Sequence, residues 1–92
     1  MGIFDKIKDL NEMRKQAQMI EQMLKAEQIT GASSGNKIKI TIDGNQKILS
    51  VEVDESVAGD KGEVARNIRA AFEDLFAKHK KLLQGKFGSM MQ

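Results

Sequence analysis

The chain contains no cysteine, no tryptophan and no tyrosine, and its aromatic residues are four phenylalanines. Without cysteine it has no disulfide scaffold, no thiol chemistry and no zinc site with cysteine ligands. With so few aromatic rings it lacks the platform on which single-stranded nucleic acids stack. A chain without cysteine also fits a reducing compartment, so we expect a cytoplasmic protein.

Long hydrophobic runs are missing too. No segment approaches the length of about 18 apolar residues that a membrane-spanning helix needs. A signal peptide needs an apolar core near the N-terminus, where this chain has Asp5, Lys6, Lys8 and Asp9. Lys6 also breaks the myristoylation motif that Gly2 would begin. We therefore expect no contact with a membrane.

The net charge is only +2, which does not by itself indicate a nucleic-acid partner. The distribution is uneven, however, because residues 61–92 hold seven basic and three acidic residues, and no acid follows Asp74. The lysines beyond that point are Lys78, Lys80, Lys81 and Lys86. The C-terminal part is therefore the basic end of the chain.

The N-terminal quarter carries one long apolar stripe. Its members recur at spacings of three, four and seven, and neither glycine nor proline interrupts residues 3–29. This spacing predicts one helix over residues 1–27. The stripe consists of Ile3, Leu10, Met13, Ala17, Ile20 and Leu24.

A helix of this length does not fit inside a compact domain of this size. At its usual rise it is roughly 36 Å long, whereas a compact chain of 92 residues has a radius of gyration of about 12 Å. Part of the helix should protrude, and a second copy of the chain is the simplest cover for its stripe. We expect a homodimer whose interface includes Leu10, Met13, Ala17, Ile20 and Leu24.

Residues 28–55 indicate a small antiparallel sheet, because two runs alternate apolar and polar side chains. The inward-facing residues are Ile38, Ile40 and Ile42 in the first run and Leu49, Val51 and Val53 in the second. Asp43, Gly44 and Asn45 between the runs predict a tight hairpin, since glycine and asparagine accept positive φ angles. Residues 28–31 leave open a short leading strand, and residues 31–36 form a turn-rich connector.

Residues 60–84 form the last predicted helix. Asp60 is its expected N-cap, with Glu63 in the capping-box position. Gly85 is expected to end it, which leaves residues 85–92 as a tail. Its broad apolar face should pack on both strand runs as one core, through Val64, Ile68, Ala71, Phe72, Leu75, Phe76 and Leu82.

The expected fold is therefore α+β, in a single domain over residues 1–92. A long N-terminal helix leads into an antiparallel hairpin or three-stranded sheet, and a C-terminal helix follows. Two such chains form an intertwined dimer with protruding helices.

Several short segments occur in an order that is specific when they are taken together. They are Lys-Gln-Ala-Gln at 15–18, Ile-Thr-Gly at 29–31, Gly35, Ile-Lys-Ile-Thr-Ile at 38–42, Gly44, Val-Glu-Val-Asp at 51–54 and Ala-Ala-Phe-Glu-Asp at 70–74. In these segments the chain resembles the YbaB/EbfC family of bacterial nucleoid-associated proteins over nearly its whole length. The resemblance implies an α+β dimer with protruding helices that binds double-stranded DNA with loose sequence preference.

The chain departs from that family in three places. Glu55 stands where the family often has proline, the glycine-rich loop keeps Gly31 and Gly35 alone, and the C-terminal tail is short. These differences concern the shape of the loops more than the fold.

Two groups of cations are the predicted DNA-binding residues. Lys78, Lys80 and Lys81 lie at the basic end of the last helix, and Arg14 and Lys15 on the first helix are clamp residues. A purely structural role stays open for the lysines, because cations at a helix C-terminus interact favourably with the helix dipole. Whether one helix or both touch DNA also stays open.

No set of residues indicates catalysis, a metal or a cofactor. His79 has no nucleophile or carboxylate placed to orient it, and the acids between residues 54 and 63 lack the spacing of a calcium loop. The segment from Gly31 to Gly35 lacks the Gly-Lys-Ser/Thr of a phosphate-binding loop. We expect a protein that is not an enzyme.

Two functions remain. The first is a dimeric nucleoid-associated protein that binds double-stranded DNA through contacts between Lys or Arg and phosphates. The alternative is a protein-interaction module whose protruding, Met-rich helices grip a partner protein. The five bases and five acids of residues 1–27 favour this alternative.

Overall fold

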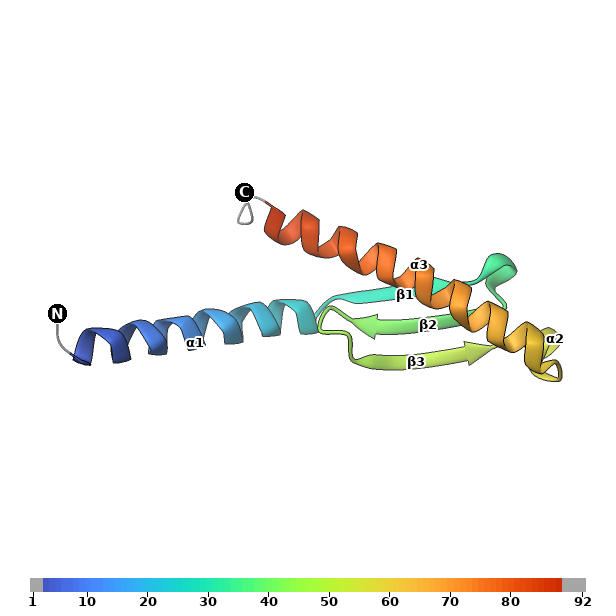
Figure 1. Ribbon diagram of the computed structural model, residues 1–92, viewed down its shortest axis with the longest axis horizontal. Coiled ribbons are helices and arrows are strands. Elements are labelled where there is room, and N and C mark those ends of the chain that lie inside the picture. The colour runs from blue at the N-terminus through green and yellow to red at the C-terminus, as the bar shows by residue number, and fades with distance from the viewer. Residues whose placement is uncertain (1–2, 89–92) are drawn as a thin grey trace.

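The computed structural model describes residues 3–88, with side chains from Asp9 onward. Its elements are α1 (Ile3–Lys25), β1 (Gln28–Ala32), a turn of 3-10 helix (Ser34–Asn36), β2 (Ile38–Asp43), β3 (Ile48–Val53), α2 (Glu55–Ala58) and α3 (Lys61–Phe87). The strands pair antiparallel in the order β1-β2-β3 (Figure 1). The predicted α+β class is confirmed, and the leading strand is present. Residues 1–2 of the predicted first helix, the side chain of Ile3 and residues 89–92 of the predicted tail lie outside the described part.

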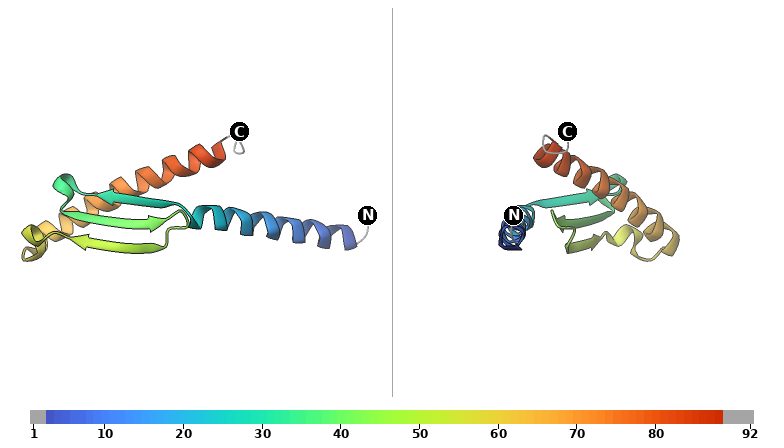
Figure 2. Two further views of the ribbon diagram at one scale, coloured as in Figure 1. Left: turned by 180° about the vertical axis from the view of Figure 1, so that it is seen from behind. Right: turned by 60° about the vertical axis from the view of Figure 1, so that its left-hand side comes forward.

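α1 projects from one end of the sheet and does not pack on it (Figures 1 and 2). The radius of gyration is 18.7 Å and the extents are 65 × 23 × 20 Å, whereas a compact chain of this length has a radius of about 12 Å. The predicted protrusion of the first helix is thereby confirmed. α3 crosses one face of the sheet and continues toward the same end of the molecule as α1.

The core lies between the sheet and α3. Its buried members are Ile29, Ile38, Ile40, Ile42, Ala71 and Leu75. Gly31 pairs with Ile40 and so faces the helix, where a Cβ would overlap Leu75 and the Ala71 carbonyl oxygen. Gly31 therefore belongs to β1, the leading strand left open for residues 28–31, and the connector starts after Ala32. It is needed because β1 approaches the helix backbone closely.

No helix of the described residues covers β3. The strand pattern predicts that Leu49, Val51 and Val53 lie under the last helix, and this prediction is wrong, because they are 45%, 55% and 44% exposed. Val51 pairs with Ile40 and Val53 with Ile38, so both face the core side. A helix about 10 Å wide covers about two strands spaced about 4.8 Å apart. α3 lies over β1 and β2 and leaves the third strand open.

The turn between β2 and β3 is stabilised by Asp43, whose Oδ1 accepts hydrogen bonds from the N–H groups of Asn45 (2.8 Å) and Lys47 (2.9 Å). The predicted hairpin is confirmed, but the residue with a positive φ is Gln46, at 69°, and not Gly44 or Asn45. Gly44 instead makes room for α1, because a Cβ there would lie 2.9 Å from Leu24 Cβ.

Asp60 caps α3 as predicted, since its Oδ1 accepts from the N–H groups of Gly62 (3.0 Å) and Glu63 (3.1 Å). The reciprocal half of the capping box does not form. Glu63 binds Arg66 at 2.7 Å, and the Asp60 N–H donates to the Val57 carbonyl of the unpredicted helix α2. This short helix supplies the acceptor that Glu63 was expected to provide.

α3 runs through Gly85 to Phe87, so the prediction that Gly85 ends the helix is wrong. Glycine inside a helix costs about 1 kcal/mol. The last turn is held nevertheless, because Lys86 forms an ion pair with Glu27 at 2.8 Å and the flanking Leu83 and Phe87 are half-buried.

Candidate nucleic-acid interface

The five predicted DNA-binding residues lie on two helices that extend toward the same end of the molecule (Figure 1). Arg14 and Lys15 are exposed on α1, and Lys80 and Lys81 are exposed on α3. Among the described residues, no hydrogen bond or ion pair joins the two groups. They are therefore brought to one end of the fold and not into one cluster.

Lys78 differs from its neighbours because its ammonium group binds Asp74 and the backbone of the edge strand β1. Its Nζ lies 2.9 Å from Asp74 Oδ2 and donates to the Thr30 carbonyl oxygen, also at 2.9 Å. Asp74 in turn accepts from the Ala32 N–H at 3.0 Å. This N–H and, next in size, the Lys78 ammonium hold the pKa of Asp74 below its ordinary value of 3.8. Asp74 lies four residues before Lys78, at the spacing of a helical ion pair.

Lys80 and Lys81 lack such partners. His79, between them and Lys78, is buried beside Gly44 of the hairpin, and successive positions on a helix point about 100° apart. Within the described residues, neither Lys80 nor Lys81 forms an ion pair, and the same holds for Arg14 and Lys15. These four are exposed cations able to meet an external anion.

Three other cations of α3 already have carboxylate partners. Arg69 binds Glu73 at 3.2 Å, and Arg66 binds Glu63 at 2.7 Å. The pair between Lys86 and Glu27 joins α3 to the segment after α1. Some of the basic residues at the C-terminal end of the sequence thus form ion pairs within the chain.

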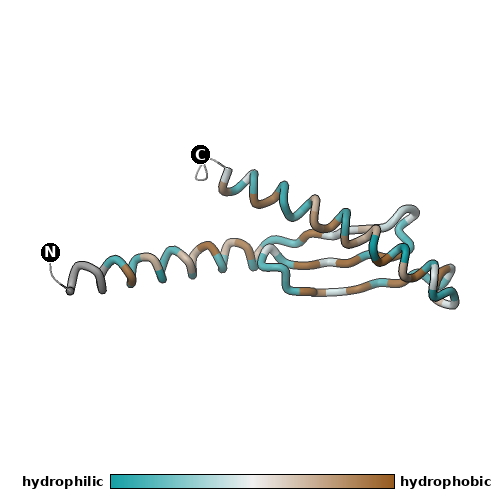
Figure 3. The backbone as a smooth tube through the Cα atoms, viewed as in Figure 1, coloured by the Kyte–Doolittle hydropathy of each residue, from teal (hydrophilic) through white to brown (hydrophobic). Residues whose placement is uncertain are grey.

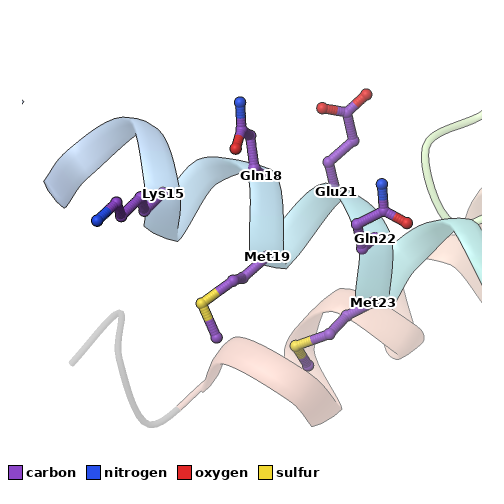
Figure 4. A pocket seen from close by; sticks show the side chains of 6 residues that line it. All are labelled: Lys15, Gln18, Met19, Glu21, Gln22 and Met23. Atoms are coloured by element: carbon purple, nitrogen blue, oxygen red, sulfur yellow. The ribbon is translucent and has the colours of Figure 1, made fainter. Parts of the chain in front are cut away.

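α1 carries an open groove on its own surface, lined by Lys15, Gln18, Met19, Glu21, Gln22 and Met23. Figure 4 shows Met19 and Met23 pointing to one side of the helix while Gln18 and Glu21 point to the other. The two methionines are 65% and 48% exposed. This is the surface that the protein-interaction alternative would use.

A second apolar surface, the β3–α3 surface, lies beside the core. We define it by Ile48, Leu49, Val51, Val53, Ile68 and Phe76, all exposed in the single chain. Figure 3 shows apolar segments in β3 as well as in β2. Of the predicted dimer residues on α1, Leu10 and Met13 are exposed and Ile20 is half-buried. Leu24 is already buried by its own chain.

The described residues contain no group of three His, Cys, Asp or Glu side chains that could hold a metal ion. Within residues 3–88, none of the helices has the length and hydrophobicity required to cross a membrane.

Two relatives from Prochlorococcus marinus match the chain. "Nucleoid-associated protein PMM0020" from subsp. pastoris (strain CCMP1986 / NIES-2087 / MED4) is 36% identical over 67 residues, which are 72% of this chain and 58% of that protein. "Nucleoid-associated protein P9515_00191" from strain MIT 9515 has the same identity and coverage. The chain thus spans less than two thirds of the length of these relatives.

The fold is also that of a solved structure, the crystal structure of uncharacterized protein HP0035 from Helicobacter pylori. The two superpose with a TM-score of 0.79 over 100% of this chain and 99% of the other, at 18% identity. At this identity the likeness concerns the fold alone. Family membership rests on the sequence: residues 1–92 match the YbaB/EbfC DNA-binding family, and the chain belongs to that family.

Proposed function

We propose that the protein is a homodimer that binds double-stranded DNA with low sequence specificity, as a nucleoid-associated protein of the cytoplasm. The observation that carries the proposal is the pair of exposed lysines, Lys80 and Lys81, on the helix that extends toward the same end of the molecule as α1. The family is a DNA-binding one and not a family of enzymes. The relatives are named nucleoid-associated proteins.

Low specificity follows from the kind of contact. Lysine and arginine contacts to phosphates fix a protein on the duplex but carry no sequence information. Arg14, Lys15, Lys80 and Lys81 offer four such contacts per chain, and a two-fold axis doubles them. Acidic residues on α1, including Glu12 and Glu21, are exposed as well and limit the total attraction.

The β3–α3 surface supports the dimer. An exposed apolar surface continuous with the core is typical of an interface between subunits. The two edges of the sheet also differ, because Asp74 and Lys78 bind the outer peptide groups of β1, at Ala32 and Thr30. Among the described residues β3 has no such covering helix, so we place the second copy there. Leu10, Met13, Ala17 and Ile20 on α1 stay a further predicted contact.

One observation favours the alternative function. Met19 and Met23 are exposed on an arm whose acids and bases are balanced, and flexible methionines suit an adaptable protein interface. In that case any association with DNA would pass through the partner protein.

A titration of the purified protein against several unrelated DNA duplexes, repeated across salt concentrations, distinguishes direct DNA binding from the protein-interaction function. Direct phosphate binding gives similar affinity for every duplex, and the affinity falls with salt by about 0.9 log unit per log unit for each contact. If no duplex binds even at low salt, the DNA proposal fails and the interaction module remains.

A further inference from the structure

The peptide groups of one residue, Gly44, connect two helices. Its N–H donates to the Leu24 carbonyl oxygen at the end of α1 (2.8 Å), and its carbonyl oxygen lies 2.9 Å from Nε2 of His79 on α3. A carbonyl oxygen only accepts, so Nε2 carries the proton and donates. The bond is buried. Gly44 thus links the base of α1 to the side of α3.

The same hairpin also completes the end of α1. The last carbonyl groups of a helix have no partners within it. Here the Glu21 carbonyl oxygen accepts from the side-chain amide of Asn45 (2.9 Å), and that of Leu24 accepts from Glu27 as well as Gly44. Leu24 itself is buried against Gly44, where no Cβ would fit. The hairpin therefore holds the C-terminal end of α1 through these hydrogen bonds and through Leu24.

Beyond the hairpin, the described part of the chain does not cover α1 between residues 9 and 19. Every side chain from residue 9 to residue 19 is exposed. Within one chain, the direction in which the arm leaves the sheet is thus set at its base, by Gly44 and by the groups that hold Gly44 in place.

We propose that His79 is a positioning residue that fixes the direction of the α1 arm through the Gly44 carbonyl group. His79 adjoins Lys80 in the chain, so the bond sets the spacing between the cations of α3 and those of α1, Arg14 and Lys15. The role of that spacing rests on the proposed function, namely DNA binding by both helices.

The direction of the arm is measurable without DNA. The chain has no cysteine, so Asn11→Cys on α1 and Ser50→Cys on β3, both at exposed positions, give a unique pair of sites for spin labels. Double electron–electron resonance then reports the distance between them, with labelled protein diluted in unlabelled protein so that one chain of a dimer carries labels. Residues 11–24 form a lever of about 20 Å, and a tilt of about 15° at its base moves the label by about 5 Å.

Two substitutions separate the hydrogen bond from the packing. In His79→Met the side chain fills similar space without a donor, and we expect the distance distribution to broaden or shift by several ångströms. In His79→Gln the amide nitrogen reaches the place of Nε2, and we expect the distribution of the unsubstituted protein to return. An unchanged distribution in His79→Met would overturn the proposal.

Loss of stability alone is controlled by Val57→Ala. Val57 is buried in α2, at the end of the sheet opposite to α1 (Figure 1). This variant should lower the melting temperature and leave the distance unchanged. Equal broadening in Val57→Ala would show that the arm responds to general loosening, which also overturns the proposal.

DNA binding by the unlabelled variants then tests whether the direction of α1 affects the affinity for DNA. We expect His79→Met to bind a duplex several-fold more weakly at low salt and His79→Gln to bind like the unsubstituted protein. A changed distance with unchanged affinity would refute the part of the proposal that concerns DNA. Failure of the unsubstituted protein to bind any duplex would refute the proposed function and leave the distance result intact.

Discussion

At the scale of single residues, Gly44 and Gly85 occupy opposite surroundings. Gly44→Ala would bring a Cβ to 2.5 Å from the Leu24 carbonyl oxygen, a backbone atom, and such overpacking costs about 1–3 kcal/mol. Gly85 lies inside α3 with nothing within 4 Å of an added Cβ, so Gly85→Ala should stabilise the protein by about 1 kcal/mol. Urea unfolding should give changes of opposite sign. Changes of the same sign would contradict the packing at Leu24.

Asp74 makes stability depend on pH. Its pKa is lowered in the folded protein by the Ala32 N–H and then by Lys78, so its carboxylate stabilises the fold above the ordinary value of 3.8. That contribution disappears as the pH falls from this value through the lower folded pKa. In Asp74→Asn we expect lower stability at neutral pH and a smaller loss on acidification. A constant difference between the two proteins from pH 7 to pH 2 would exclude this role.

The role of a residue can be predicted from the sequence when its partner is a few positions away in the same helix. It cannot be predicted in this way when the partner belongs to another helix or strand. The Asp60 cap and the pair between Arg69 and Glu73 follow from spacing along one helix. His79 gave no signal, because its partner lies 35 positions away in a turn. Turn chemistry places Gly44 in the hairpin through its tolerance of positive φ, whereas the fold requires glycine there because the hairpin lies close to α1, which the local pattern does not show.

At the scale of elements, periodicity gave the type and order of the main helices and strands but not the extent of cover. Alternation shows that Val51 and Val53 share a face of β3, but not the register shift that puts Ile48 opposite Ile42. The number of strands that α3 covers also depends on where the helix crosses the sheet. The four-residue helix α2 was missed because it is too short to show a period.

The open face of β3 yields a prediction for the dimer. Val51 belongs to the β3–α3 surface, whereas Ser50 lies on the opposite, polar face of the same strand. Val51→Asp would bury an unpaired charge in the interface, so we expect dissociation at micromolar concentration in analytical ultracentrifugation. Ser50→Asp has the same unfavourable strand propensity and should stay dimeric. A dimeric Val51→Asp would move the interface elsewhere, with the α1 stripe as the next candidate.

At the scale of the whole molecule, the elongated shape followed from one comparison, that of helix length with the expected radius of a compact chain. The DNA-binding residues were harder to predict, because charge in a sequence does not show which cations are already paired. Lys78 belonged to the predicted group, but its bonds to Asp74 and Thr30 give it a structural task. Lys80 and Lys81 keep their charge exposed at the end from which α1 projects.

The sharpest test of the interface compares two double substitutions on α3 that remove the same charge. Lys80→Gln with Lys81→Gln removes exposed cations that have no ion-pair partner among the described residues. Arg66→Gln with Arg69→Gln removes cations already paired with Glu63 and Glu73. We expect the first variant to stay dimeric and to lose affinity for every duplex alike. Its salt dependence should flatten by up to about 3.6 log units per log unit for the two copies in a dimer.

The arginine variant should change affinity little, because each arginine already has a carboxylate partner and lies nearer the other end of α3. The matching change on α1, Arg14→Gln with Lys15→Gln, should weaken binding no more than the lysine variant, since exposed acids share that helix. Equal losses in the lysine and arginine variants would mean that DNA responds to net charge alone. Unchanged affinity and salt dependence in the lysine variant would leave Lys80 and Lys81 as cations that interact with the helix dipole, and the contact would then lie on α1.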